Sequence, residues 1–131
     1  MSRNQAFAAV STVAVLLGLA LGFRQAGSPG LQRLANADAA RIEDLNAISQ
    51  AVSRHYAAYG KLPQSLAELG GNGLGLRLSE PDTSTAYDYR PLDERRFELC
   101  ATFATDNRAE VRRPARRRVH GAGRQCFAYP E

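Results

Sequence analysis

The side chains with the strongest intrinsic chemistry in this sequence are two cysteines, Cys100 and Cys126, and two histidines, His55 and His120. A thiolate beside an imidazole could act as a nucleophile, and thiolates and imidazoles together could hold zinc. No local catalytic signature surrounds either cysteine, and Cys100, His120 and Cys126 supply only three loosely spaced zinc ligands. We therefore expect no catalytic residue, no metal and no cofactor, and we expect that the protein is not an enzyme.

A disulfide between Cys100 and Cys126 is the interpretation that we favour over metal binding, catalysis and free thiols, which remain alternatives. It depends on the compartment, because a cysteine pair in a small domain outside the cytoplasm is usually oxidised. The closed loop of about 25 residues would contribute roughly 3 kcal/mol of stability in the chain-entropy model. It would also restrain the arginine-rich segment between the two cysteines.

The compartment is indicated by residues 6–23, which carry no charged side chain. As a helix this run would be roughly 27 Å long, enough to cross the hydrocarbon core of a bilayer. It exceeds the roughly 7–15 apolar residues of a signal peptide and offers no clean Ala-x-Ala cleavage site. We therefore favour a single-pass signal anchor over a cleaved signal peptide or a buried soluble helix. Residues 1–5 would be cytoplasmic, and everything after residue 23 would lie across the membrane.

The next elements are a break and a long helix. Residues 24–35 contain the sequence GSPG and predict a linker. Residues 36–59 predict an amphipathic helix, because apolar side chains recur at intervals of three and four from Ile42 onward. Asn36 or Asp38 would cap its start. We expect its opposite face to be solvated, with the residues Arg41, Glu43, Asp44, Asn46, Gln50 and Arg54.

The second half of the chain predicts strands. Residues 62–70 resemble a short helix, and the alternating segments 86–92 and 95–103 predict an antiparallel hairpin. Residues 104–124 predict a long basic loop, and residues 125–131 a last short strand. In the hairpin, alternation separates Cys100 from an apolar stripe formed by Phe97, Leu99, Ala101 and Phe103.

Together these elements predict an α+β fold. An N-terminal transmembrane helix would precede a long amphipathic helix packed on a small antiparallel β-sheet, because neither layer can bury its apolar face alone. The folded domain would span residues 36–131.

Charge is unevenly distributed along this domain. Residues 36–106 carry seven basic and eleven acidic side chains, whereas residues 107–124 carry seven arginines and one glutamate. Such an arginine cluster suits an anionic surface, such as lipid headgroups, a polysaccharide or an acidic protein face. A solvated loop is the structural alternative, and a location across the membrane disfavours nucleic acid as a partner. The candidate anion-binding residues are Arg112, Arg113, Arg116, Arg117 and Arg118.

The order of these features resembles type IV pilin-like proteins, and most of all the major pseudopilins of type II secretion. The resemblance covers roughly residues 38–103. It rests on the end of the long helix and on the turn-rich loop after it, with the matching residues Tyr56, Gly60, Leu62, Pro63, Pro81, Asp82, Tyr87 and Tyr89. It implies a pilin-like head in the bacterial inner membrane that acts through protein–protein contacts in a secretion or pilus-type assembly.

The sequence departs from that family in its apolar run and in its arginine-rich loop. The apolar run starts at Ala6 without the prepilin peptidase motif, and it lacks the glutamate that registers subunits in pilin filaments. The acidic loop in which major pseudopilins often bind calcium is replaced by arginines, so no calcium site is expected. We therefore expect a membrane-anchored, non-catalytic protein of the cell envelope with an envelope protein as partner, the domain lying in the periplasm or outside the cell. The alternative is a secreted or periplasmic module that binds anionic polymers or lipid through its arginine-rich loop.

Overall fold

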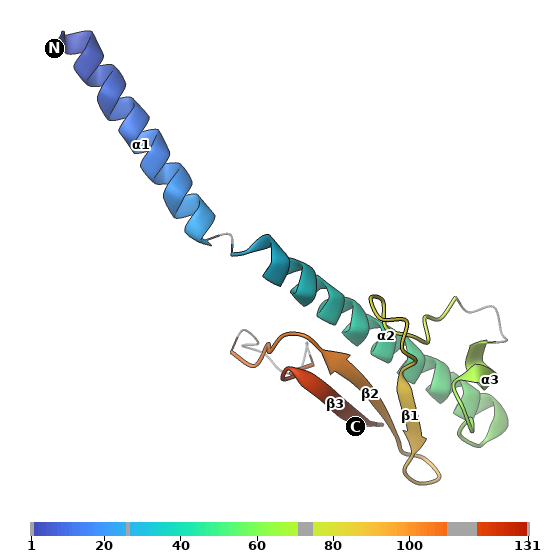
Figure 1. Cartoon of the computed structure of the whole chain (residues 1–131). Coiled ribbons are helices and arrows are strands. Elements are labelled where there is room, and N and C mark those ends of the chain that lie inside the picture. The colour runs from blue at the N-terminus through green and yellow to red at the C-terminus, as the bar shows by residue number, and fades with distance from the viewer. Residues whose placement is uncertain (1, 26, 71–74, 110–117, 131) are drawn as a thin grey trace. The chain divides into compact units, whose positions relative to one another are not determined.

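The computed structural model describes residues 2–25, 27–70, 75–109 and 118–130. The chain forms two compact units, Met1–Gln32 and Arg33–Glu131, which we describe separately. Its elements are shown in Figure 1 and are, in chain order, α1 (Arg3–Gln25), α2 (Pro29–Tyr59), α3 (Ala67–Gly70), β1 (Asp88–Pro91), β2 (Phe97–Phe103) and β3 (Gly123–Tyr129).

Helix α1 contains the whole apolar run of residues 6–23, and none of its residues is buried. Phe7 is 77% exposed and Phe23 is 79% exposed, so the apolar side chains of this helix are exposed within its own unit. By length and composition this helix could cross a membrane. A helix suits that environment because it satisfies its backbone hydrogen bonds internally.

Helix α2 begins earlier than the sequence pattern predicts. Ser28 caps it, because the Leu31 N–H donates to the Ser28 Oγ at 3.2 Å, and Pro29 occupies the first helical position. The linker predicted over residues 24–35 is therefore largely helical, and Asp38 is not a cap. The GSPG sequence that indicated a break contains the start signal of the helix.

The buried face of α2 packs on one face of the β-sheet. Leu45, Ile48 and Val52 are fully buried and belong to one core cluster with Phe97 and Leu99. The predicted spacing of apolar side chains therefore identifies the correct helix face. Gly60 ends the helix with a left-handed backbone (φ 68°), and its N–H donates to the Tyr56 carbonyl at 2.8 Å.

Helix α3 is shorter than the helix predicted over residues 62–70. Pro63 and Leu66 precede it and are buried, so this segment packs against the core without forming a regular helix. The Tyr89 hydroxyl donates to the Pro63 carbonyl at 2.8 Å and joins the segment to β1.

The three strands form an antiparallel sheet in the order β1–β2–β3. The predicted hairpin is confirmed, and the last strand begins at Gly123 instead of Gln125. Along β2, the apolar stripe of Phe97, Leu99, Ala101 and Phe103 is buried against the core. The predicted α+β fold is confirmed. An apolar N-terminal helix, followed by an amphipathic helix on a small antiparallel sheet, is a pilin-like architecture.

Candidate functional site

The two cysteines form a disulfide, as the sequence predicts. Cys100 in β2 lies directly opposite Cys126 in β3, with the two Cα atoms 4.1 Å apart. The Glu98 carboxylate lies within 4.8 Å of both sulfur atoms. Because the sulfurs are bonded to each other, neither is a thiolate that could attack a substrate or bind a metal.

Cys100 is buried although it does not belong to the apolar stripe. Only 4% of it is exposed, whereas Cys126 is exposed. On the same face of the sheet, the Arg124 Nη2 lies 2.9 Å from the Asp88 carboxylate, so an ion pair joins β3 to β1 across β2. The alternation correctly separates Cys100 from the apolar stripe, although Cys100 is itself buried.

The histidines do not lie beside the disulfide. His120 was expected in the long basic loop, and the structure buries it, with its ring stacked 4.0 Å from the ring of Phe103. The backbone N–H of His120 donates to the Asn107 Oδ1 at 2.9 Å. Phe103 lies on the core face of β2 and Cys100 on the other, so His120 is part of the core. His55 contacts Tyr59 at the end of α2.

Four of the five candidate anion-binding arginines, Arg112, Arg113, Arg116 and Arg117, lie outside the described residues. The fifth, Arg118, places its guanidinium over two aromatic rings of β3. The distance is 4.2 Å to the ring centre of Tyr129 and 5.1 Å to that of Phe127. This cation–π stack fixes a positive charge beside β3, and the anion-binding interpretation stays a prediction.

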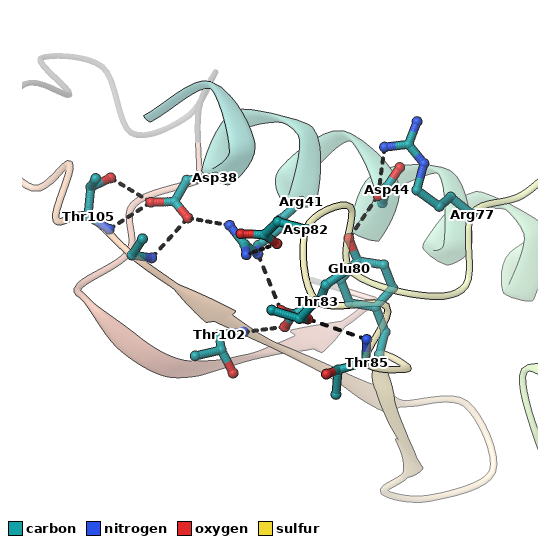
Figure 2. A network of polar contacts seen from close by, with 12 residues as sticks. Asp38, Arg41, Asp44, Arg77, Glu80, Asp82, Thr83, Thr85, Thr102 and Thr105 are labelled. Atoms are coloured by element: carbon teal, nitrogen blue, oxygen red, sulfur yellow. Dashed lines mark hydrogen bonds and ion pairs between the residues drawn. The ribbon is translucent and has the colours of Figure 1, made fainter. Parts of the chain in front are cut away.

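A network of carboxylates that sequence reasoning missed lies at the end of β2, where β2 extends beyond β1. The last β1 pair is Asp88 with Cys100, so the next backbone N–H groups on that side have no strand partner. Figure 2 shows how side chains replace the strand. The Glu80 carboxylate accepts the Thr102 N–H at 2.9 Å, and the Asp38 carboxylate accepts the Ala104 N–H at 3.0 Å.

Arg41 connects these carboxylates (Figure 2). Its guanidinium lies 2.8 Å from Asp38 and 3.5 Å from Glu80, and it also donates to Asp82. Only 3% of Arg41 is exposed, so its charge requires these partners. Burial alone would lower the pKa of Arg41, but the hydrogen bond to Asp82 and the three negative charges raise it above its usual value. The same hydrogen bond lowers the pKa of Asp82.

The prediction that Arg41 lies on the solvated face of α2 is wrong. The helical pattern places Arg41 among polar neighbours, and the acidic groups that bury it come from the loop before β1, far away in sequence. Asp38 three residues earlier is the only local signal, and such a pair is common on exposed helices.

A second polar contact joins α2 to the start of the hairpin. The Tyr87 hydroxyl donates to the Asp44 carboxylate at 2.8 Å, and Arg77 lies 3.8 Å from the same carboxylate. Burial and this hydrogen bond raise the pKa of Tyr87. Asp44 was expected to be solvated, and it is partly buried because Tyr87 covers it.

The chemistry of these groups is structural. In the part of the network that Figure 2 displays, the carboxylates accept backbone N–H groups or pair with arginine, so they hold α2, the loop before β1 and the end of β2 together. Comparison with known proteins finds no matching family model, no matching curated protein and no matching solved structure.

Proposed function

We propose that this chain is a membrane-anchored protein of the bacterial cell envelope whose folded head binds another protein and catalyses no reaction. The observation that carries the proposal is α1, which is 23 residues long and has no residue buried in the chain itself. An apolar surface of this size is costly in water, and a bilayer would cover it. The chain would cross the inner membrane once, through residues 6–23.

The disulfide supports a head on the outer side of that membrane. Disulfides persist in oxidising compartments such as the periplasm and are rare in the cytoplasm. Cys100 and Cys126 are the only cysteines of the chain and are paired with each other. The head would therefore lie in the periplasm or outside the cell.

The pilin-like architecture supports protein–protein contact as the activity of the head. The buried network around Arg41 gives the head fixed geometry, which favours a preformed binding surface. A secretion or pilus-type assembly is the setting that we propose for this partner.

The second candidate is a secreted or periplasmic module that binds anionic polymers or lipid. It is favoured by the seven arginines of residues 107–124, one of which, Arg118, is held on the aromatic rings of β3. In this candidate, the N-terminal segment would be removed by signal peptidase.

Mass spectrometry of the native amino terminus separates the two candidates. An intact terminus in a membrane fraction that resists alkaline carbonate supports the anchor, and loss of about 25 residues with release from the membrane supports the secreted module. A Leu17→Arg variant should lose carbonate resistance, because a central arginine costs roughly 2.5–3.5 kcal/mol on insertion. The matched control, Gln25→Arg at the end of α1, should retain it.

A further inference from the structure

In the part of the chain that the structure describes, the outer edge of β3 is an open edge of the sheet. β3 pairs with β2 along all its residues, and no described residue adds a fourth strand beyond it. An edge strand exposes backbone N–H and C=O groups that can pair with another chain. β3 is also the longer of the two edge strands, with 7 residues against 4 in β1.

The register tells which backbone groups of β3 point outward. In an antiparallel pair, closely opposed residues about 4.5 Å apart direct their N–H and C=O groups away from each other. Cys100 and Cys126 are 4.1 Å apart, so they form such a pair. The Thr102 N–H agrees, because it points away from β3 and donates to Glu80. The N–H groups of Arg124, Cys126 and Ala128 therefore point to the open side of β3.

The opposite edge of the sheet, formed by β1 and the end of β2, offers fewer free backbone N–H groups among the described residues. Where β2 extends beyond β1, the carboxylates of Asp38 and Glu80 occupy its N–H groups and would repel an incoming carbonyl oxygen. β1 itself ends in Pro91, which has no N–H. Among the described residues, β3 carries neither a proline nor a carboxylate along its length.

The charges beside β3 indicate what would pair with it. Arg124 lies on the outer face of the sheet, and its side chain is 61% exposed. Arg118 lies on the other face, over the rings of Phe127 and Tyr129. A strand added to β3 would thus have a guanidinium beside each of its faces. Although Arg124 already pairs with Asp88, a guanidinium has five N–H donors and can bind a second carboxylate.

A second copy of the chain fits this edge poorly. Asp38, early in α2, contacts the end of β2, and Tyr56, near the end of α2, contacts Arg95 just before β2. Helix α2 therefore runs along the direction of β3, as Figure 1 also shows. Antiparallel pairing of two β3 strands would reverse α2, so the amino-terminal ends of the two α2 helices would lie at opposite ends of the paired sheet. It would also bring two arginine-bearing edges together.

We propose that the outer edge of β3 receives an extended acidic segment of a different protein, which becomes the fourth strand of the sheet. Main-chain hydrogen bonds to Arg124, Cys126 and Ala128 supply the attachment, and Arg118 and Arg124 select acidic side chains. This inference rests on the proposed function, because it names the surface and the chemistry of the protein partner proposed there.

Amide hydrogen exchange of the full-length chain in detergent micelles tests the edge directly. The probe is a synthetic peptide of seven residues that alternates glutamate and valine, and the matched control peptide replaces glutamate with lysine. In the free chain, the amides of Arg124, Cys126 and Ala128 should exchange quickly, whereas those of Gln125 and Phe127, which face β2, should exchange slowly. The acidic peptide alone should slow the three outward amides by about tenfold or more.

Two pairs of variants test the two contributions. Ala128→Pro removes an outward N–H without removing a bond to β2, and it should weaken binding of the acidic peptide by about tenfold, whereas Ala128→Val should bind normally. Arg124→Gln should weaken binding of the acidic peptide and reduce the preference of the chain for the acidic peptide over the lysine peptide. Thermal unfolding identifies any variant that loses its fold. If the Ala128→Pro variant does not fold, the Arg124→Gln variant still tests the inference.

Several results would overturn the inference. Slow exchange of the three outward amides in the free chain would mean that its own residues cover the edge. Equal protection by both peptides, or protection by neither, would refute an acidic segment as the fourth strand. A dimer that forms through β3 would show that the edge binds a second copy of the chain. Carbonate resistance is independent of these measurements. If the chain binds the peptide but is extracted by carbonate, only the membrane anchor is refuted. If the chain resists carbonate but does not bind the peptide, only the added strand is refuted.

Discussion

Thr105 donates two hydrogen bonds to the carboxylate of Asp38, one from its backbone N–H at 2.7 Å and one from its hydroxyl at 2.6 Å. The two residues are separated by most of the folded domain in sequence. The contact joins α2 to the chain that leaves β2, and Asp38 is 1% exposed. A charge-assisted hydrogen bond in such a place is stronger than one in water.

Substitution of Thr105 and substitution of Asp38 should lower the free energy of unfolding by different amounts. Thr105→Val leaves the backbone bond and should lower the free energy of unfolding by about 1 kcal/mol. Asp38→Ala leaves two N–H groups and Arg41 without their acceptor and should lower it by roughly 3–5 kcal/mol. Urea unfolding of both single variants and the double variant measures the coupling, and fully additive effects would contradict the contact.

Arg41→Met should be among the most destabilising changes at a charged residue of the described chain. Loss of the guanidinium leaves three carboxylates close together without a cation, at a cost of roughly 3–5 kcal/mol. Arg54→Met is the matched control, because Arg54 lies on the exposed side of the same helix and its loss should change stability by no more than about 0.5 kcal/mol. Equal urea midpoints for the two variants would show that the network contributes little.

The stability of the head should fall at acidic pH in part through Asp82. Because Arg41 lowers the pKa of Asp82 in the folded chain, Asp82 binds a proton more readily after unfolding. Its contribution is therefore complete above the unfolded pKa of about 3.9 and is lost as the pH falls through the lower folded pKa. Between roughly pH 6 and pH 2, the free energy of unfolding should fall less in the Asp82→Asn variant than in the unmodified chain.

In that experiment, Asp93 and Asp106 serve as the internal reference. Hydrogen bonds from Arg95 and Arg96 lower the pKa of Asp93 to about 2, and those from Arg108 lower the pKa of Asp106 to about 2. They contribute the same acid dependence to both chains, so the difference between the chains isolates Asp82. Parallel pH curves would contradict the role assigned to Arg41.

Reduction of the disulfide should loosen the segment before β3 earlier than it affects α2. The closed loop contributes roughly 3 kcal/mol in the chain-entropy model, mainly by restricting the unfolded chain. The Asn107 N–H donates to the His120 carbonyl, and the His120 N–H donates to the Asn107 side-chain oxygen. In reductant, these two amides should lose exchange protection before those of Leu45 and Ile48. A Cys100→Ala/Cys126→Ala variant should behave in the same way without reductant. Simultaneous loss at all four amides would mean that the head unfolds as one unit.

The features that could be predicted from the sequence are those with a local period. The alternation in β2 and the helical spacing after Ile42 identify the buried faces correctly, because side-chain direction repeats within each element. The cysteine pairing could be predicted because there is only one pair to form.

The polar interior could not be predicted, because its partners come from distant segments. Arg41 and His120 both resemble solvated residues in their local sequence. Each is buried by contacts made through β2. The ring of Phe103 stacks on His120, and Glu80, which accepts the Thr102 N–H, lies beside Arg41. The early start of α2 was missed for a local reason, since Ser28 and Pro29 begin a helix as readily as they interrupt one.

The position of the disulfide has a mechanical consequence. Cys126 lies near the middle of β3, so tension applied at the carboxyl terminus can peel only the residues beyond it from β2 before the force reaches a covalent bond. From Cys100 the force passes into the central strand of the sheet, whose far end is fastened to α2 through Asp38. A pull on β3 is therefore transmitted to the helix that leads to the amino-terminal segment, and the sheet does not unzip from its edge.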